Sequence, residues 1–260
     1  MRAALAFLLM ALAACGGPGA APPGETGFET PQSGSAFLQP DTRALQADEF
    51  ANPGFLWVDR GMVFFRTAPE TGPACASCHS EQSRPLKGAA ARYPAVDPAT
   101  GKLFNLERRI NACRTRHQNA PAFDYESEPL LALTTYVASL SRGEPLQVEV
   151  SGPAARHYEA GRDYFFTRRG QLNLSCHQCH DRNWGRQLRG DTISQGHPNG
   201  FPAYRFEWQT LGSLHRRLED CDAGVRAEPM APGSDTYVAL ELYLAARAQG
   251  LALESPGVRR

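Results

Sequence analysis

The 260-residue sequence has no excess of either charge, because 27 Lys and Arg residues balance 27 Asp and Glu residues. A net charge of zero gives no overall field that would attract nucleic acid, so nucleic-acid binding is not expected. Beyond the N-terminal stretch, no apolar run is long enough to cross a bilayer as a helix. The sequence also lacks sustained strand-like alternation, which favours an all-α fold with long loops.

The N-terminus has the features of an export signal. Arg2 precedes an apolar stretch that is too short to span a bilayer stably, and the stretch ends in a Leu-Ala-Ala-Cys motif at Cys15, which resembles a bacterial lipobox. A plain secretory signal cut nearby is the alternative. We predict a signal peptide over 1–14, lipid attachment to the membrane at Cys15 and a periplasmic location. Residues 15–48 are rich in small residues and Pro, and are predicted to be a flexible tether.

Four of the seven cysteines stand in two Cys-x-x-Cys-His motifs. The motifs contain Cys75, Cys78 and His79, and Cys176, Cys179 and His180. This spacing is typical of c-type haem attachment, in which two thiols bond to the haem vinyl groups and the His binds the iron. A zinc site or a redox dithiol is the alternative, but zinc generally needs further close Cys or His pairs. We therefore predict two covalently bound haem c groups.

The surroundings of the two motifs are repeated. A Phe-Phe pair precedes each motif. Phe64 of the first pair lies eleven positions before Cys75, and Phe165 of the second pair lies eleven positions before Cys176. Downstream, the matching segments are Leu106–Cys113 and Leu214–Cys221, in which Leu, Arg, Arg, a branched aliphatic residue and Cys keep their offsets. One difference is His215, which stands where the first copy has Glu107. Such a repeat indicates two copies of one haem-binding unit.

Apolar side chains at helical spacing predict the helices of each copy. We expect a helix before each haem motif, a middle helix that leads to the remaining Cys, and a closing helix. The expected ranges are 59–66 and 153–168, then 105–113 and 213–221, then 128–143 and 235–250. We therefore predict an all-α protein of two tandem cytochrome c-like domains, 49–150 and 151–260, related by internal duplication.

The second axial ligand of each iron has one repeated candidate. After the haem motif, no Met or His recurs at an equivalent position in both copies, whereas Cys113 and Cys221 do. We expect the motif His and this thiolate to bind each iron, which would stabilise ferric iron and lower its reduction potential. A disulfide between Cys113 and Cys221 is the alternative, as in many exported proteins. Arg109 and Arg217 lie four residues before these cysteines, where they would stabilise a thiolate or pair with a haem propionate.

The segment from Leu214 to Asp222, followed by Arg226-Ala-Glu-Pro229, is similar to SoxA, the larger subunit of the SoxAX cytochrome of bacterial sulfur oxidation. The resemblance covers about residues 50–250, and the two intact haem motifs resemble the two-haem form of the family. It implies an L-cysteine S-thiosulfotransferase that joins thiosulfate to a Cys of the carrier protein SoxYZ, with electrons passing to the haem of the partner SoxX. It also implies that Cys221 is the catalytic thiolate, found as a persulfide, and that Arg217 binds substrate.

Two other functions are open on the residues alone. One is a passive two-haem electron carrier, in which both arginine pairs hold propionates. The other is a reductase or peroxidase with an open iron site. They differ from the enzyme in the role of Cys221, because only the enzyme needs extra sulfur on that residue.

Overall fold

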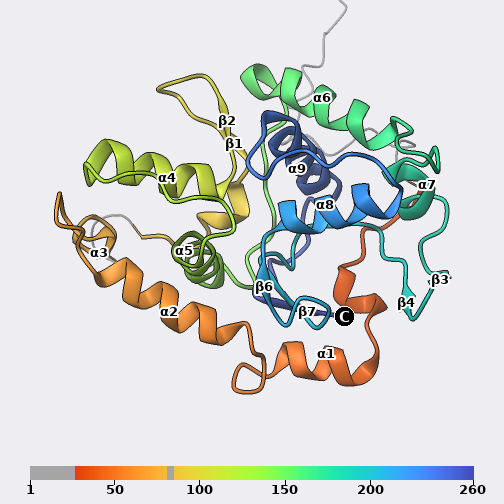
Figure 1. The fold of residues 1–260 in the computed structure, drawn as a ribbon, viewed down its shortest axis with the longest axis horizontal. Helices are drawn as coiled ribbons and strands as arrows, with labels where there is room; N and C mark the ends of the chain where they lie inside the picture. The colour runs from red at the N-terminus through yellow and green to blue at the C-terminus, as the bar shows by residue number, and fades with distance from the viewer. Residues whose placement is uncertain (1–26, 81–84) are drawn as a thin grey trace, which may run out of the picture.

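The computed structural model describes residues 27–80 and 85–260, so the expected signal peptide and Cys15 lie outside the described residues. Helices dominate the described part (Figure 1). They are α1 (Pro40–Ala47), α2 (Phe55–Arg66), α3 (Cys75–Cys78), α4 (Leu106–His117), α5 (Glu128–Ser139), α6 (Ala155–Phe166), α7 (Cys176–His180), α8 (Leu214–Gly224) and α9 (Asp235–Arg247), with short 3-10 helices η1 (Gly34–Phe37), η2 (Ala90–Arg92) and η3 (Gly152–Ala154). None of the helices in these two ranges is long and apolar enough to cross a bilayer.

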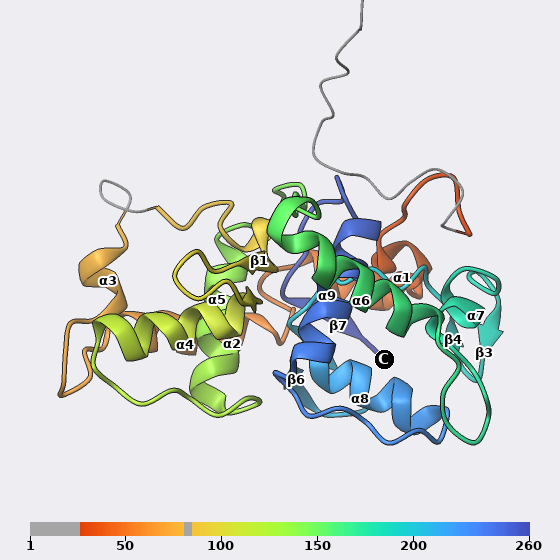
Figure 2. The ribbon, with the colours of Figure 1, turned by 90° about the horizontal axis from the view of Figure 1, so that it is seen from above.

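The same helix order occurs twice. In each half, a long helix precedes a short helix that carries the Cys-x-x-Cys motif, and two further helices follow. Figure 2 shows α2 to α5 on one side of the molecule and α6 to α9 on the other. The expected first, middle and closing helices are therefore confirmed in both halves, with ends that differ from the prediction by a few residues.

The first and closing helices of each half cross at a glycine. A Cβ atom at Gly61 of α2 would lie 2.1 Å from the carbonyl oxygen of Ala132 on α5. A Cβ atom at Gly161 of α6 would lie 2.0 Å from the carbonyl oxygen of Ala239 on α9. No side chain fits at either point, so glycine permits the close approach of the two backbones. No motif or spacing in the sequence distinguishes these glycines from the others.

One helical turn after each of these glycines lies a phenylalanine, Phe65 on α2 and Phe165 on α6. These two residues are equivalent in the structure, which differs from the alignment expected from the sequence. The ring of Phe65 lies 5.1 Å from that of Tyr136, and the ring of Phe165 lies 5.2 Å from that of Tyr243. Phe65 and Phe165 are therefore structural equivalents, whereas equal spacing to the haem motifs aligned Phe64 with Phe165. The alignment by spacing is wrong by one residue because the connection from helix to haem motif is one residue longer in the second half.

The chain before α2 packs on the C-terminal half, where α1 lies beside the last strand, β7 (Figure 1). The side-chain oxygen of Gln46 accepts the backbone N–H of Val258 at 3.0 Å, and its amide donates to Glu254 at 3.0 Å. The expected flexible tether over 15–48 is therefore wrong for the described stretch from Gly34 to Ala47. The residues that this stretch contacts belong to the C-terminal end of the chain, so the local sequence does not reveal the contact.

Short strands are present in the described residues, so the expectation of a purely α-helical chain is not confirmed. The strands are β1 (Ala95–Val96), β2 (Leu103–Phe104), β3 (Gln187–Leu188), β4 (Asp191–Thr192), β5 (Ala203–Arg205), β6 (Thr210–Gly212) and β7 (Gly257–Arg259). The first four form two hairpins, and β6-β5-β7 form a sheet in which β5 and β7 run parallel. Strands of two or three residues are too short to show alternation in a sequence.

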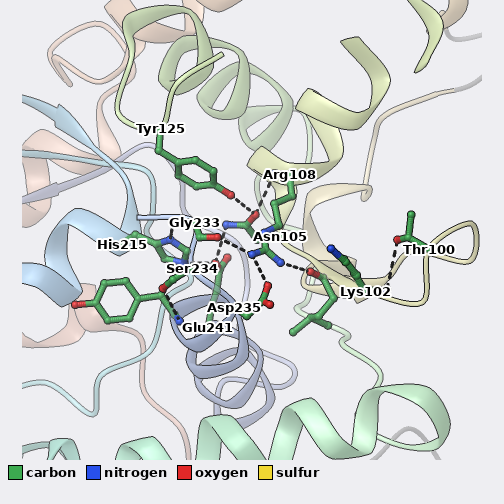
Figure 3. Close-up of polar contacts among 12 residues, drawn as sticks. Thr100, Lys102, Asn105, Arg108, Tyr125, His215, Gly233, Ser234, Asp235 and Glu241 are labelled. Atoms are coloured by element: carbon green, nitrogen blue, oxygen red, sulfur yellow. Dashed lines mark hydrogen bonds and ion pairs between the residues drawn. The ribbon is translucent and has the colours of Figure 1, made fainter. Parts of the chain in front are cut away.

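Polar contacts join the two halves at the start of α4 (Figure 3). The amide of Asn105 donates to Glu241 on α9 at 3.1 Å, and the hydroxyl of Tyr125 donates to Asn105 at 3.0 Å. Arg108 forms an ion pair with Asp235 at 2.6 Å. These bonds fix the N-terminal end of α4 against α9.

A cavity of about 60 Å³ lies at this junction. Its lining includes three pairs of residues at equivalent positions in the repeat, namely Leu106 and Leu214, Thr134 and Glu241, and Ala138 and Ala245. Glu107 also lines the cavity, and its counterpart His215 places Nε2 3.1 Å from Glu241. Burial, followed by the charge of Glu241, raises the pKa of Glu107 above the ordinary carboxyl range.

Candidate haem and catalytic site

The second haem motif forms a complete small helix, α7. Ser175 and Gln178 cap its start reciprocally, since each side chain accepts a hydrogen bond from the backbone of the other residue. Residues three and four apart lie on one face of a helix, so Cys176 faces the same way as Cys179 and His180. The sequence-predicted attachment residues are thus brought together by a local structure that the motif itself specifies.

The imidazole of His180 is oriented by the loop that follows α7. Its Nδ1 lies 2.8 Å from the carbonyl oxygen of Ser194, to which it donates, and this leaves Nε2 with a lone pair. Burial lowers the pKa of His180, so the ring is neutral, as iron binding requires. Gly196 has a positive φ of 77° and lies against the ring, where a Cβ atom would come within 2.8 Å of the imidazole Cγ.

An ion-pair network holds α7 to α9. Asp181 lies at the end of α7 and pairs with Arg247 of α9 at 2.6 Å and with His177 at 2.8 Å. The Arg247 guanidinium is fully buried and lies 4.3 Å from the ring centroid of Phe165. Because both charges of the Asp181–Arg247 pair are withdrawn from water, the position of α7 is strongly specified.

Cys221 lies near the C-terminal end of α8, the end that points toward α7 in both views (Figures 1 and 2). It is a free thiol, so it is not bridged to Cys113. Burial and then the charge of a Cys221 thiolate raise the pKa of Cys176 to about 12, and the same two causes raise the pKa of Cys179. The structure therefore brings the sulfur of Cys221 to the two attachment cysteines of the second half.

Arg217 lies near this sulfur. The charge of a Cys221 thiolate is the main reason that the pKa of Arg217 is raised, and Arg217 also lies 3.8 Å from Asp220. Its neighbour Arg216 points elsewhere, with its guanidinium 4.5 Å from the centre of the Trp208 ring. Of the arginine pair on α8, Arg217 is thus the one placed to act on Cys221 or on an anion bound there.

The first half has the same groups in a different electrostatic setting. Burial raises the pKa of Cys75, a hydrogen bond from Gln118 lowers it, and the charge of a Cys113 thiolate raises it, which places Cys113 beside the first motif. Arg109, however, donates to Asp97 at 2.9 Å and to the hydroxyl of Tyr93 at 3.0 Å. The counterpart of Arg217 is therefore engaged away from the sulfur.

Asp97 holds two arginines of α4 at once. Arg116 and Arg109 both pair with its carboxylate, which is buried at 1% exposure. The hydrogen bond from Arg116 is the main reason that the pKa of Asp97 lies far below the ordinary carboxyl range. The cluster fastens α4 to the β1–β2 hairpin, so Arg109 and Arg116 have a structural role.

Arg205 of β5 was missed by the sequence analysis. Its side chain is buried, pairs with Glu207 at 2.6 Å and lies close enough to Arg217 that repulsion, after burial, lowers the pKa of Arg205. No signal in the sequence pointed to it, because β5 is too short to be predicted and the equivalent position of the first half holds Asp97 rather than a repeated Arg. It adds a second positive charge on the side of Arg217.

The donor set in each half fits a haem c group. Each half brings the sulfur of its remaining Cys near a thiol of its own motif, and the second half also orients its imidazole so that Nε2 keeps its lone pair. Two thiols suit covalent attachment to vinyl groups, and His with a thiolate suits axial ligation of iron. The same groups would also support thiol chemistry at Cys221, since its sulfur is beside a cation.

Comparison with known proteins gives a consistent result. Residues 60–146 match the SoxA/TsdA cytochrome c domain family, which supports covalently bound haem c. The chain is 41% identical over 233 residues to the L-cysteine S-thiosulfotransferase subunit SoxA of Rhodovulum sulfidophilum, covering 89% of this chain and 81% of the relative. It is 39% identical to that of Paracoccus pantotrophus, covering 89% and 80%.

A solved structure is also similar. The crystal structure of SoxXA from P. pantotrophus matches with a TM-score of 0.85 and 38% sequence identity, covering 90% of this chain and 88% of that chain. The match extends over both halves described above, and it applies to a chain crystallised in a SoxXA assembly.

Proposed function

Because the chain belongs to the SoxA family of L-cysteine S-thiosulfotransferase subunits, we propose that it binds thiosulfate and transfers it to a cysteine, with Cys221 as the catalytic sulfur and Arg217 as the substrate-binding residue. The observation that carries the assignment is the difference between the two arginines. Arg217 lies near Cys221, whereas the equivalent Arg109 is bound to Asp97. Among the described residues, Arg217 is thus the arginine on which the charge of the Cys221 thiolate acts most, whereas Arg109 and Arg116 are bound by the Asp97 carboxylate.

The chemistry follows from an anionic sulfur beside a guanidinium. Thiosulfate is a dianion, and Arg217 and Arg205 supply positive charge that would hold its oxygens. Formation of an S–S bond between the terminal sulfur of thiosulfate and the Cys221 sulfur releases two electrons. A thiolate of the carrier then attacks the terminal thiosulfate sulfur, forms its own S–S bond and releases Cys221 as a thiolate. The persulfide form of Cys221 would react in the same way through its outer sulfur.

Two haem c groups complete the proposed site. When bound, they supply one-electron acceptors for the two electrons that bond formation releases. Cys75, Cys78, Cys176 and Cys179 would attach the haem groups, and His79, Cys113, His180 and Cys221 would bind the two irons. This assignment makes each half a cytochrome c-like domain, related to the other by duplication.

The partners and location follow from the family. SoxX would form a heterodimer with this chain and accept electrons through its own haem, and SoxYZ would provide the acceptor cysteine. The Cys-x-x-Cys-His motifs and the expected N-terminal signal support a periplasmic location, and we propose Cys15 as the site of a lipid anchor. Mass spectrometry of the native protein would count the haems and detect acyl chains on Cys15.

The test is Cys221→Ala in the full chain with its partner cytochrome. We expect thiosulfate-dependent reduction of the partner haem to fall below detection in an absorption assay, because no sulfur remains to accept the substrate. Mass spectrometry should still find both haems attached, since Cys176, Cys179 and His180 are unchanged. Turnover retained by this variant would contradict the assignment of Cys221 as the catalytic sulfur.

A further inference from the structure

Asp222, the residue after Cys221, is buried. Its Oδ2 accepts a hydrogen bond from the hydroxyl of Tyr164 at 2.5 Å and another from the hydroxyl of Tyr237 at 2.8 Å. A carboxylate that leaves water needs such donors, because an unpaired buried charge costs several kcal/mol. Asp222 is therefore held firmly by two phenols.

The two phenols come from different helices. Tyr164 lies on α6, the helix that leads to the second haem motif, and Tyr237 lies on α9, the closing helix. Their rings pack edge to face with centroids 6.2 Å apart, and Tyr237 is fully buried. Asp222 thus ties α8 to both neighbouring helices at the turn that carries Cys221.

Arg169 connects the same carboxylate to the loop between α6 and α7. Its Nε lies 3.7 Å from Oδ1 of Asp222, and its guanidinium lies 4.4 Å from the centre of the Tyr164 ring. Beside it, Gly170 has a φ of +67°, and a Cβ there would lie 2.2 Å from the carbonyl oxygen of Val225. The loop that delivers the haem motif is therefore packed directly on the end of α8.

In the described residues of the first half, the position after the equivalent Cys has different contacts. The residue after Cys113 is Arg114, which donates to the carbonyl oxygen of Pro121 at 2.9 Å and stacks on Phe123 at 3.6 Å. Arg114 is thus bound to the segment that follows α4, whereas Asp222 is bound to α6 and α9. The anchor belongs to the half in which the sulfur of the proposed function reacts.

We infer that Asp222 is a positioning residue for Cys221, which it holds against the second haem site through Tyr164 and Tyr237. A reacting sulfur that breaks and forms bonds in each turnover needs a backbone that does not move with it, because a displacement of about 1 Å costs about a hundredfold in rate. The inference rests on the proposed function, since it assumes that Cys221 reacts.

The test uses the haem-loaded protein with its partner and three changes: Asp222→Asn, the double change Tyr164→Phe with Tyr237→Phe, and the control Tyr158→Phe. Tyr158 is on α6 too, but it packs on Tyr243 at 5.4 Å. The first readout is electron paramagnetic resonance of the ferric haems. We expect the second-haem signal to split into several low-spin species in the Asp222 and double variants, while the first-haem signal and the control stay unchanged.

The second readout is steady-state kinetics with thiosulfate. We expect kcat to fall at least tenfold in both variants with little change in KM, because Arg217 still binds the substrate. A single unaltered second-haem signal in the double phenylalanine variant, with unaltered kcat, would overturn the inference even if Asp222→Asn fails to fold. Failure of the proposed function would look different, since the unmodified protein would then not turn over thiosulfate.

Discussion

Arg109 and Arg217 stand at equivalent positions of the repeat, yet their surroundings give them different roles. Arg217 lies near the Cys221 sulfur, and Arg109 pairs with the buried carboxylate of Asp97. At the scale of single residues, function is thus decided by what lies opposite a side chain. The same holds for Asp222 and Arg114, which follow the two equivalent cysteines and bind different elements.

This difference predicts a matched pair of results for Arg217→Met and Arg109→Met. The first should lower kcat/KM for thiosulfate by about tenfold to a hundredfold, equivalent to about 1.4–2.8 kcal/mol, through loss of the cation that holds the dianion. The second should leave kcat/KM unchanged and lower the free energy of unfolding by about 1–3 kcal/mol, because Asp97 loses a charged donor. Steady-state kinetics and chemical denaturation check both. Equal kinetic losses in the two variants would show that the arginines share one role.

Among the helices, the crossings of α2 with α5 and of α6 with α9 leave no space for an added side chain. Both depend on a glycine whose absent side chain lets a carbonyl oxygen of the other helix approach to within contact distance. Interiors are close-packed, so an added methyl group has to displace a whole helix.

Gly161→Ala is therefore expected to lower the free energy of unfolding by about 1–3 kcal/mol or more, since its Cβ would lie 2.0 Å from the Ala239 carbonyl oxygen. Gly61→Ala should behave alike at the other crossing. Gly190→Ala serves as the control, because only the end of the flexible Arg260 side chain lies near it, at 3.7 Å. Calorimetry of the three variants measures the effect, and a Gly161 variant as stable as the Gly190 variant would rule out the close crossing.

At the scale of the whole molecule, the two halves meet around buried carboxyl groups. Glu107 faces Glu241 across the junction, with His215, Tyr125 and Glu126 nearby, and burial is the main reason that its pKa is raised. A carboxyl group whose pKa is higher in the folded than in the unfolded state stays protonated after folding. Its contribution to stability is fully present below the ordinary carboxyl pKa and is lost as pH rises through the higher, folded-state value.

We expect the protein to be less stable at pH 9 than at pH 5, with Glu107→Gln removing part of the difference. The variant should be more stable than the unmodified protein by about 1 kcal/mol or more at pH 9, and close to it at pH 5. Glu128→Gln is the control, since Glu128 is half-exposed and pairs with Arg60 at the surface. Denaturation curves at pH 5 and pH 9 measure the free energy of unfolding of each protein. If Glu107→Gln raises it equally at both pH values, ionisation of Glu107 is excluded as the cause.

The haem motifs, the repeat and the closing helices could be predicted from the sequence because each depends on residues close in the chain. The spacing of Cys176, Cys179 and His180 suits one turn of helix wherever that helix lies. The equivalence of Cys113 and Cys221 identified them as candidate sulfur ligands, and the structure places each beside the motif of its own half.

Only the tertiary structure decided which groups face the two sulfurs. The buried state of Asp222, the arginine of β5 and the packing of α1 on β7 all join residues far apart in the chain, and short-range patterns carry no information about such pairs. Two equivalent helices therefore received different neighbours, because duplication copies local sequence, whereas burial and charge pairing depend on the whole assembled chain.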